Sequence, residues 1–444
     1  MEYRQTMIRL VHTFMFFALL IVPLTADAKT TSYTLKQAVE YALAANPSIE
    51  SKLLAIERAQ MGVGAAQSAF WPTVSLVKNW SRLRNSGGAG STEDYSNKAM
   101  SRGVRVSLSL FAGFAHLNNV QKALLSVDME KSRHRQARLE LIGNIQLQLL
   151  QLLKSREDMK TVQESKKRIG TQLKAAQAFV DVGMAPYLNV LQNEVELTKV
   201  NQQEIRVANS IRSAEVMLNK YLGYNTNDRI EYKGSLKDFS GVVGYTEEEA
   251  INTSMYSRPD LIMAQKSVAV ALKQSHITAG GYLPKLNVSY DKMRSTKTYS
   301  DHQYSRNDYE RSYWNIGLNF SWDVFDGGGT TFTFLGDRKT VSALRKDYED
   351  AMNGARAEVI RSLLDIRAAK ELITASRKGV EAASESYAMA NKRYQTSTGT
   401  ITELLDAQLR LTQAEEDYSL ALTEFHGARS RFFYHIGKEN IGLD

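Results

Sequence analysis

The chain contains the same pattern twice, and this internal duplication limits the possible folds more than any other feature of the sequence. Asn46-Pro47 in the first half corresponds to Arg258-Pro259 in the second, and Phe70-Trp71-Pro72 corresponds to Tyr282-Leu283-Pro284, both at a spacing of 212 residues. Later correspondences have a spacing of 214, so the two copies drift by only two residues. A match sustained over so long a stretch predicts two structural repeats with the same order of elements.

The matched positions give the domain plan. We expect a signal peptide over residues 1–28, a first repeat over 29–223, a polar connector over 224–245, a second repeat over 246–437 and a C-terminal tail over 438–444. The first segment has an apolar run that ends at the small-residue site Ala26-Asp27-Ala28, which is typical of secretory signals. The protein is therefore expected to be exported.

Two very long segments lack any helix-breaking proline. Proline occurs only 6 times in 444 residues, and none lies in 115–181 or 330–396. Both segments are rich in good helix formers and have apolar residues at helical spacing, such as Leu139, Ile142 and Ile145. Each predicts a coiled-coil helix on the order of 100 Å long, at about 1.5 Å per residue.

Four shorter segments alternate apolar and polar residues with a period of two. They lie at about 73–82, 103–111, 285–292 and 312–325. In the last of them, Trp314, Ile316 and Leu318 alternate with polar residues. This pattern predicts a sheet with one apolar face and one polar face. Between the strands of each half, 82–102 and 292–312 are rich in Ser, Gly, Asn, Asp and Tyr, so we expect long polar loops there.

Such a sheet has two interpretations. In a membrane barrel the apolar face meets lipid, and in a soluble sandwich it meets a second layer of strands. We favour the barrel because the rest of the chain offers no other strands. Aromatic residues also gather near the strand ends, as in barrel girdles: Trp71, Trp80, Tyr282, Tyr313, Trp314 and Trp322. Closed barrels need about eight strands, so copies must combine, and the sequence permits two, three or four.

Composition and motifs exclude several functional classes. The chain has no cysteine, and its net charge of +8 comes from 56 basic and 48 acidic residues that are interspersed, with no basic block typical of nucleic-acid binding. The histidines beyond the signal peptide show no metal-ligand spacing, and we expect all of them to be exposed. We therefore expect no cofactor, no metal, no nucleic-acid partner and no enzymatic activity.

With these features the sequence resembles the TolC family of outer-membrane efflux and type I secretion channels. The duplicated plan and a set of motifs carry the resemblance: Asn46-Pro47, Arg258-Pro259, Trp71-Pro72, Leu283-Pro284, Phe325-Asp326-Gly327-Gly328, and the breaks near Gly183 and Thr398. The resemblance implies a mainly α fold with a small β part. In a homotrimer, each chain would give four strands to a 12-stranded outer-membrane β-barrel, and the long coiled-coil helices would form a periplasmic α-barrel.

The resemblance also implies function, location and partners. The chain would be a passive exit duct of a tripartite efflux or type I secretion system, held in the outer-membrane lipid of a Gram-negative bacterium and extending into the periplasm. A periplasmic adaptor protein would open its tips, and an inner-membrane pump of the RND or ABC type would supply the energy. The alternative is an exported coiled-coil structural protein or adhesin without a pore, which would not need alternating aromatic strands.

The breaks after the long helices are the expected tips. The resemblance makes two groups of residues the adaptor contacts: Val182, Gly183 and Met184 in the first break, Ser397 and Thr398 in the second. Glycine at 183 suits a left-handed helix cap. The second break departs from the family pattern, because Ser397 takes the glycine position and the glycine has moved to 399.

Three residues near the second tip correspond to the pore constriction of the family: Glu403, Asp406 and Tyr394. Glu403 and Asp406 are spaced i, i+3 and share one helix face, so a trimer would have two rings of carboxylates. The matching first-half positions are Asn189 and Gln192. A structural alternative exists for Glu403, since Thr400-x-x-Glu403 is a capping box. Tyr394 falls on the tyrosine that helps to hold the closed mouth.

Overall fold

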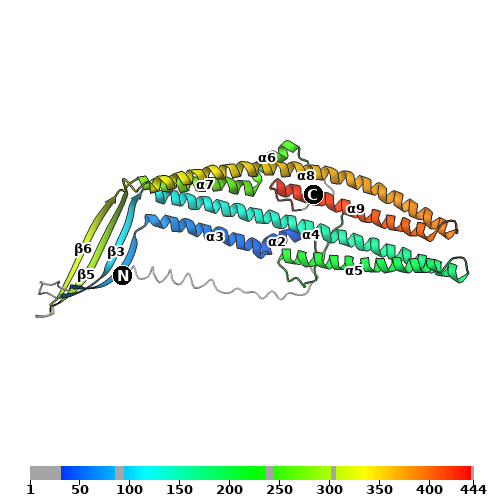
Figure 1. The fold of residues 1–444 in the computed structure, drawn as a ribbon, viewed down its shortest axis with the longest axis horizontal. Coiled ribbons are helices and arrows are strands. Elements are labelled where there is room, and N and C mark those ends of the chain that lie inside the picture. The colour runs from blue at the N-terminus through cyan, green and yellow to red at the C-terminus, as the bar shows by residue number, and fades with distance from the viewer. Residues whose placement is uncertain (1–31, 86–94, 237–243, 302–306, 442–444) are drawn as a thin grey trace, which may run out of the picture.

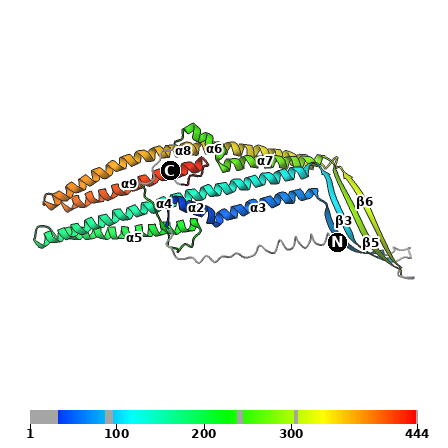
Figure 2. The same ribbon diagram turned by 180° about the vertical axis from the view of Figure 1, so that it is seen from behind.

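The computed structural model describes residues 32–85, 95–236, 244–301 and 307–441. The molecule is very elongated, with a sheet at one end and two long helical hairpins that end together at the other (Figures 1 and 2). The expected signal peptide 1–28 and the last part of the expected tail, 442–444, lie outside the described residues.

Among the helices that the structure describes, none is both long enough and apolar enough to cross a membrane.

The two repeats build helices of the same lengths in the same order. The pairs are α2 (Leu35–Ala45) with α6 (Glu247–Ser257), 11 residues each; α3 (Pro47–Gln67) with α7 (Pro259–Ala279), 21 each; α4 (Ala115–Asp181) with α8 (Gly329–Gln395), 67 each; and α5 (Leu188–Leu222) with α9 (Ile401–His435), 35 each. The short turns η1 (Ser68–Phe70) and η2 (Gly280–Tyr282) follow α3 and α7. The predicted mainly helical, duplicated fold is confirmed.

Equivalent helices begin through different side-chain chemistry. Asn46 caps α3, because its side chain accepts from the Ser48 N–H at 2.8 Å, and Pro47 takes the first helical position, where no N–H is needed. Arg258 precedes α7 without a side-chain cap, and its guanidinium instead pairs with Asp260 at 2.7 Å and Glu358 at 2.6 Å. The same backbone start is therefore held by an amide in one repeat and by an ion-pair network in the other.

The four-stranded sheet joins the two repeats. Its order is β2 (Thr73–Asn85), β3 (Tyr95–Ala112), β5 (Lys285–Asp301) and β6 (Asn307–Ser321), antiparallel throughout. The register places apolar residues of all four strands in transverse rows, for example Val74, Val106, Tyr290 and Ile316. Within the described residues, the outer edges of β2 and β6 have no strand partner.

The strands differ from the predicted ones at their ends. Much of the expected loops 82–102 and 292–312 is strand, and only 86–94 and 302–306 of them lie outside the described residues. The fourth strand ends at Ser321 rather than near 325. Apolar alternation marks only the part of a strand that faces an apolar medium, whereas the backbone ladder continues beyond it and leaves no such pattern.

A small second sheet was not predicted. β1 (Ser32–Tyr33) pairs in parallel with β4 (Glu231–Tyr232), so the expectation of no other strands is wrong. Tyr232 is buried, and its hydroxyl donates to Asn219 Oδ1 at 2.7 Å. This sheet brings the connector against the middle of the long helices.

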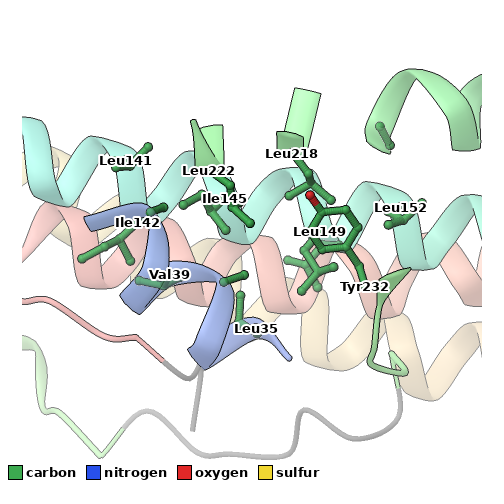
Figure 3. Packing of buried hydrophobic residues seen from close by; sticks show 14 of the residues in the cluster. Leu35, Val39, Leu141, Ile142, Ile145, Leu149, Leu152, Leu218, Leu222 and Tyr232 are labelled. Carbon is green, nitrogen blue, oxygen red and sulfur yellow. The ribbon is translucent and has the colours of Figure 1, made fainter. Parts of the chain in front are cut away.

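The hydrophobic core also lies at mid-length. In Figure 3, side chains of α2 (Leu35, Val39), α4 and α5 converge with Tyr232. The second repeat has a smaller matching cluster that includes Val359, Leu363 and Phe432. Along its length α4 contacts first α3 and then α5 of its own repeat, and it also contacts α7 and α9 of the other repeat (Figures 1 and 2). In the second repeat, α8 packs against α7 and α9.

Candidate functional site

The two hairpin turns lie at the same end of the molecule (Figures 1 and 2). In the first, Gly183 has φ +74°, its N–H donates to the Val180 carbonyl at 2.9 Å, and the Met184 N–H donates to the Phe179 carbonyl at 2.8 Å. This Schellman arrangement satisfies carbonyls that the end of α4 would leave unpaired. Val182 and Met184 are about two-thirds exposed (67% and 65%), so the turn presents apolar side chains outward.

The second turn has the same backbone without the glycine. Ser397 has φ +57°, its N–H donates to the Tyr394 carbonyl at 3.0 Å, and the Thr398 N–H donates to the Arg393 carbonyl at 2.9 Å. A left-handed conformation is unfavourable for a residue with a Cβ atom, so Ser397 is strained where Gly183 is not. Gly399 has another reason to be glycine, since a Cβ there would lie 3.0 Å from the Arg393 Cβ.

Tyr394 lies inside the packing that joins the two hairpins. It is buried with Ile401 and Leu404, and the ring of Phe179 from α4 stands edge-on to it at 5.9 Å. Burial raises the pKa of its hydroxyl. Glu403 and Asp406 are exposed on α9. The structure therefore brings the two carboxylates to one surface and places the tyrosine beneath it.

Each carboxylate has an arginine partner that the sequence analysis missed. Glu403 Oε2 lies 3.5 Å from Arg393 Nη2, and Asp406 Oδ2 lies 2.9 Å from Arg410 Nη2. The spacing of Asp406 and Arg410, four residues on one helix, is a signal that could have found the second pair. Both ion pairs are exposed to solvent, so each contributes only about 0–1 kcal/mol to the free energy of unfolding.

The capping box at the start of α9 is only half formed. The Thr400 hydroxyl accepts from the Glu403 N–H at 3.2 Å, so Thr400 caps the helix. The Glu403 carboxylate faces Arg393 instead of returning to the Thr400 N–H. The cap therefore depends on the Thr400 side chain and the Glu403 backbone.

A cluster of polar residues joins the hairpins away from the tips, and we call it the inter-hairpin cluster. Its members are Ser165, Arg168 and Gln172 of α4, Tyr387 of α8, and Gln408 and Glu415 of α9. Gln172 Nε2 donates to Gln408 Oε1 at 2.7 Å, and both side chains are buried. Arg168 lies 3.3 Å from Glu415. Sequence reasoning missed the cluster because its members are far apart in the chain and form no motif.

Two carboxyl groups, Glu415 in the cluster and Glu416 next to it in the chain, have raised pKa values. Burial raises the pKa of Glu415, although Arg168 counteracts this. Burial and the nearby Asp158 raise the pKa of Glu416. Both carboxyl groups therefore lie in surroundings that disfavour their charged form.

A groove of about 480 Å³ lies between α5 and α9 beside the tips. Half of its lining residues are apolar, among them Leu188, Leu191, Leu405 and Leu409, and the polar half includes Asp406. The predicted constriction residue Asp406 is therefore also a groove residue.

One expectation about histidine is wrong. His426 is only 1% exposed, and its Nε2 donates to the Leu236 carbonyl at 3.1 Å, so it ties the connector to α9. Burial lowers its pKa to about 4, and the nearby Arg429 adds to this effect. Of the residues that the structure describes, no three His, Asp or Glu side chains are grouped as a metal site would need.

Comparison with known proteins agrees with this architecture. The family described as outer membrane efflux protein matches twice, over residues 38–224 and 250–433. The outer membrane protein TolC of Vibrio cholerae is 21% identical over 86% of this chain and 85% of its own length, and TolC of Salmonella enteritidis is 23% identical over 92% and 80%. The CmeC outer membrane channel of Campylobacter jejuni has the same fold, with a TM-score of 0.77, 16% identity and coverage of 92% and 87%.

Both family matches fall on the repeats defined by the helices, which explains why one motif set recurs at positions such as Pro47 and Pro259. The known members are efflux channels that lie in the outer membrane and extend into the periplasm. The predicted resemblance, function and location are confirmed: the chain belongs to the outer membrane efflux protein family and is an efflux duct of the outer membrane.

Proposed function

We propose that three copies of this chain close one passive channel. The observation that carries the proposal is the sheet, whose edge strands β2 and β6 have no partner among the described residues. Unpaired backbone groups are not tolerated in lipid. One face of the sheet exposes large apolar side chains, including Leu76 at 87%, Trp314 and Phe320. Pairing β6 of one copy with β2 of the next satisfies both edges, and three copies give 12 strands.

The helices support the same arrangement. Exposed apolar side chains follow α3 and α5 on one flank of the chain, among them Met61 and Ile205, and follow α8 on the other, among them Phe332 and Met389. Apolar surface of this extent on long helices calls for helix partners. In the trimer α8 of one copy packs against α3 and α5 of the next, and the helices close a periplasmic tunnel.

The mechanism is confinement and opening rather than catalysis, and we assign the chain no enzymatic role. Substrate moves through a water-filled duct whose periplasmic mouth is formed by the α8–α9 hairpins. The inter-hairpin cluster holds these hairpins against α4. An adaptor that contacts the tips at Val182, Gly183, Met184, Ser397 and Thr398 shifts the hairpins apart, and an inner-membrane pump supplies the energy.

We place the constriction at the α9 face that carries Glu403 and Asp406. In a trimer these residues give six carboxylates around a narrow opening, where charge rings control which ions pass. Arg393 and Arg410 hold the carboxylates in place in each chain. Tyr394 acts from below, through its packing against Phe179.

Reconstitution tests this function directly. The purified full chain should run as a trimer in native mass spectrometry and should conduct ions in planar bilayers. It should also migrate differently on gels before and after heating, as closed barrels do. A stable, membrane-inserted monomer, or a trimer with no conductance, would overturn the proposal and would favour a structural or adhesive protein.

A further inference from the structure

A row of basic residues crosses the apolar face of the sheet. The ladder places Lys78 of β2 opposite Arg102 of β3, and Arg102 opposite Arg294 of β5. Lys292 lies in the adjacent row, level with Leu76 and Trp314. We call Lys78, Arg102, Lys292 and Arg294 the outward basic patch. All four are exposed.

The patch lies on the same face as the lipid-directed residues. Side chains directly opposite each other in antiparallel strands share one face, and positions two residues apart on a strand also do. The pair Leu76 and Val104 lies next to the pair Lys78 and Arg102 on the side of the sheet nearer the helices. The pair Trp80 and Met100 lies next to it on the side nearer the loops. Trp314 and Trp322 are eight residues apart, about 27 Å along a strand, so Trp314 marks the loop-side border of the apolar band.

Few acidic side chains of the protein pair with the basic residues of the patch. Arg294 pairs with Glu310 of β6. Over the described ranges, Lys78, Arg102 and Lys292 have no ion-pair partner. Like charges directly opposite in neighbouring strands destabilise a sheet, and here three stand in succession. A hollow of about 550 Å³ is lined by the four patch residues with Leu76 and Val104, and also by Val77, Gly103 and Met293, whose ladder positions belong to the other face of the sheet.

We propose that the outward basic patch binds the phosphate headgroups of anionic lipids in the leaflet at the loop end of the barrel. This inference rests on the proposed membrane barrel. Guanidinium and ammonium groups are the usual partners of phosphate, and arginine can bind it with two hydrogen bonds. A bound phosphate would remove the repulsion along the row.

The surroundings identify the occupant as a lipid rather than a soluble anion. The residues beside the patch are large, apolar and exposed, such as Leu76 at 87% and Trp80 at 68%. A ligand that covers both kinds of surface needs an anionic head and a hydrocarbon body. The opposite face of the sheet differs, because there Arg105 is already paired with Asp291 at 2.6 Å.

Tryptophan quenching by brominated lipid tests the proposal. In a background of Trp71→Phe and Trp322→Phe, the only tryptophans left are Trp80 and Trp314, which flank the patch. The full chain is placed in phosphatidylcholine vesicles that contain a small fraction of phosphatidic acid, and one lipid or the other is brominated. We expect the phosphatidic acid around these tryptophans to be enriched roughly fivefold over its bulk fraction. High salt should reduce the enrichment.

A matched pair of double variants locates the effect. Lys78→Gln with Arg102→Gln should remove most of the enrichment. Lys297→Gln with Arg311→Gln removes the same charge from the opposite face and should leave the enrichment unchanged. If the first variant does not insert, Lys78→Arg with Arg102→Lys keeps the charges and should keep the enrichment.

Three results would overturn the proposal. They are equal quenching by both brominated lipids, the same loss in both double variants, and displacement of phosphatidic acid by millimolar inorganic phosphate, which would assign the patch to a soluble anion. Conductance is recorded in the same vesicles. Normal conductance without enrichment of phosphatidic acid would reject the lipid-binding proposal and leave the proposed channel function standing. Absent conductance would reject the proposed channel function itself.

Discussion

At the first tip Gly183 takes the left-handed conformation that ends α4, and at the second tip Ser397 takes it at the end of α8. Three backbone hydrogen bonds match between the two tips, and the second tip has one more, from the Gly399 N–H to the Arg393 carbonyl at 3.0 Å. The side chains around them do not match: Arg393, Glu403 and Asp406 at the second tip replace Phe179, Asn189 and Gln192 at the first. Duplication has therefore kept the backbone of the tip and concentrated charge in one copy. The charged copy is the one that we place at the mouth of the channel.

The largest expected difference between the repeats concerns protonation. α9 buries His426 where the equivalent position of α5 has the exposed Arg212. Burial lowers the pKa of His426 to about 4, below the ordinary value of 6.5. As the pH falls, the unfolded chain therefore takes up this proton before the folded chain does. The free energy of unfolding has the full contribution of neutral His426 above pH 6.5, and it loses this contribution as the pH drops towards about 4. The loss should reach about 3 kcal/mol per chain.

Thermal unfolding of the detergent-solubilised protein between pH 7 and pH 4 measures this loss. His426→Gln keeps a donor for the Leu236 carbonyl and should flatten the curve, whereas His276→Gln, at an exposed position, should not. Glu415 and Glu416 work in the opposite direction, because groups with a raised pKa stabilise the folded state as they protonate. Because Glu415 and Glu416 are present in both wild type and His426→Gln, the difference between the two pH curves does not include their contribution. Identical pH curves for His426→Gln and wild type would contradict the assignment.

The contact between the repeats should give the next largest effect. Gln408→Leu removes the acceptor of the Gln172 amide and leaves buried polar atoms unpaired. Such a loss costs about 1–3 kcal/mol. In single-channel recordings the open state should become more frequent, because the hairpins are held less firmly.

Two controls separate this effect from general damage. Gln413→Leu changes an exposed glutamine on the same helix and should leave the recordings unchanged. Gln172→Leu with Gln408→Leu replaces both partners and should be less harmful to stability than the sum of the two single changes. Additive losses would mean that the two side chains act separately.

A smaller effect should follow from exchanging the tip residues. Ser397→Gly removes the left-handed strain, and Gly183→Ser introduces it, so the two changes should have opposite signs of about 1 kcal/mol each. Gly399→Ala should also destabilise the second tip, because its Cβ would meet Arg393. Chemical unfolding of the three variants tests this, and a loss of stability in Ser397→Gly would show that the serine side chain has a role of its own.

The tips also show what the sequence can and cannot predict. Ser397 could be placed at the glycine position because the repeats align there, and the backbone has it in that conformation. The long helices could be found because proline is absent and helix formers dominate. The pairing of Gln172 with Gln408 could not be found, since polar side chains meet there only after two distant helices pack. The buried position of Tyr394 was missed for the same reason, and the strand ends were missed because a backbone ladder needs no side-chain pattern.

The smallest effect on stability, and the most specific effect on transport, should come from the carboxylates themselves. Glu403→Gln with Asp406→Asn breaks two exposed ion pairs, each worth about 0–1 kcal/mol, and leaves the Thr400 cap in place. Trimers should therefore persist. If the six carboxylates surround the mouth, the variant should lose cation preference and sensitivity to divalent cations in planar bilayers, because a ring of charge sets the local potential.

Thr400→Ala is the matched control: it should cost about 1 kcal/mol of helix stability and leave selectivity unchanged. Arg393→Gln with Arg410→Gln should act in the opposite sense and strengthen both properties, since it leaves the carboxylates uncompensated. Selectivity that stays the same in a stable double variant would remove Glu403 and Asp406 from the pore and leave the charge asymmetry of the tips to adaptor binding.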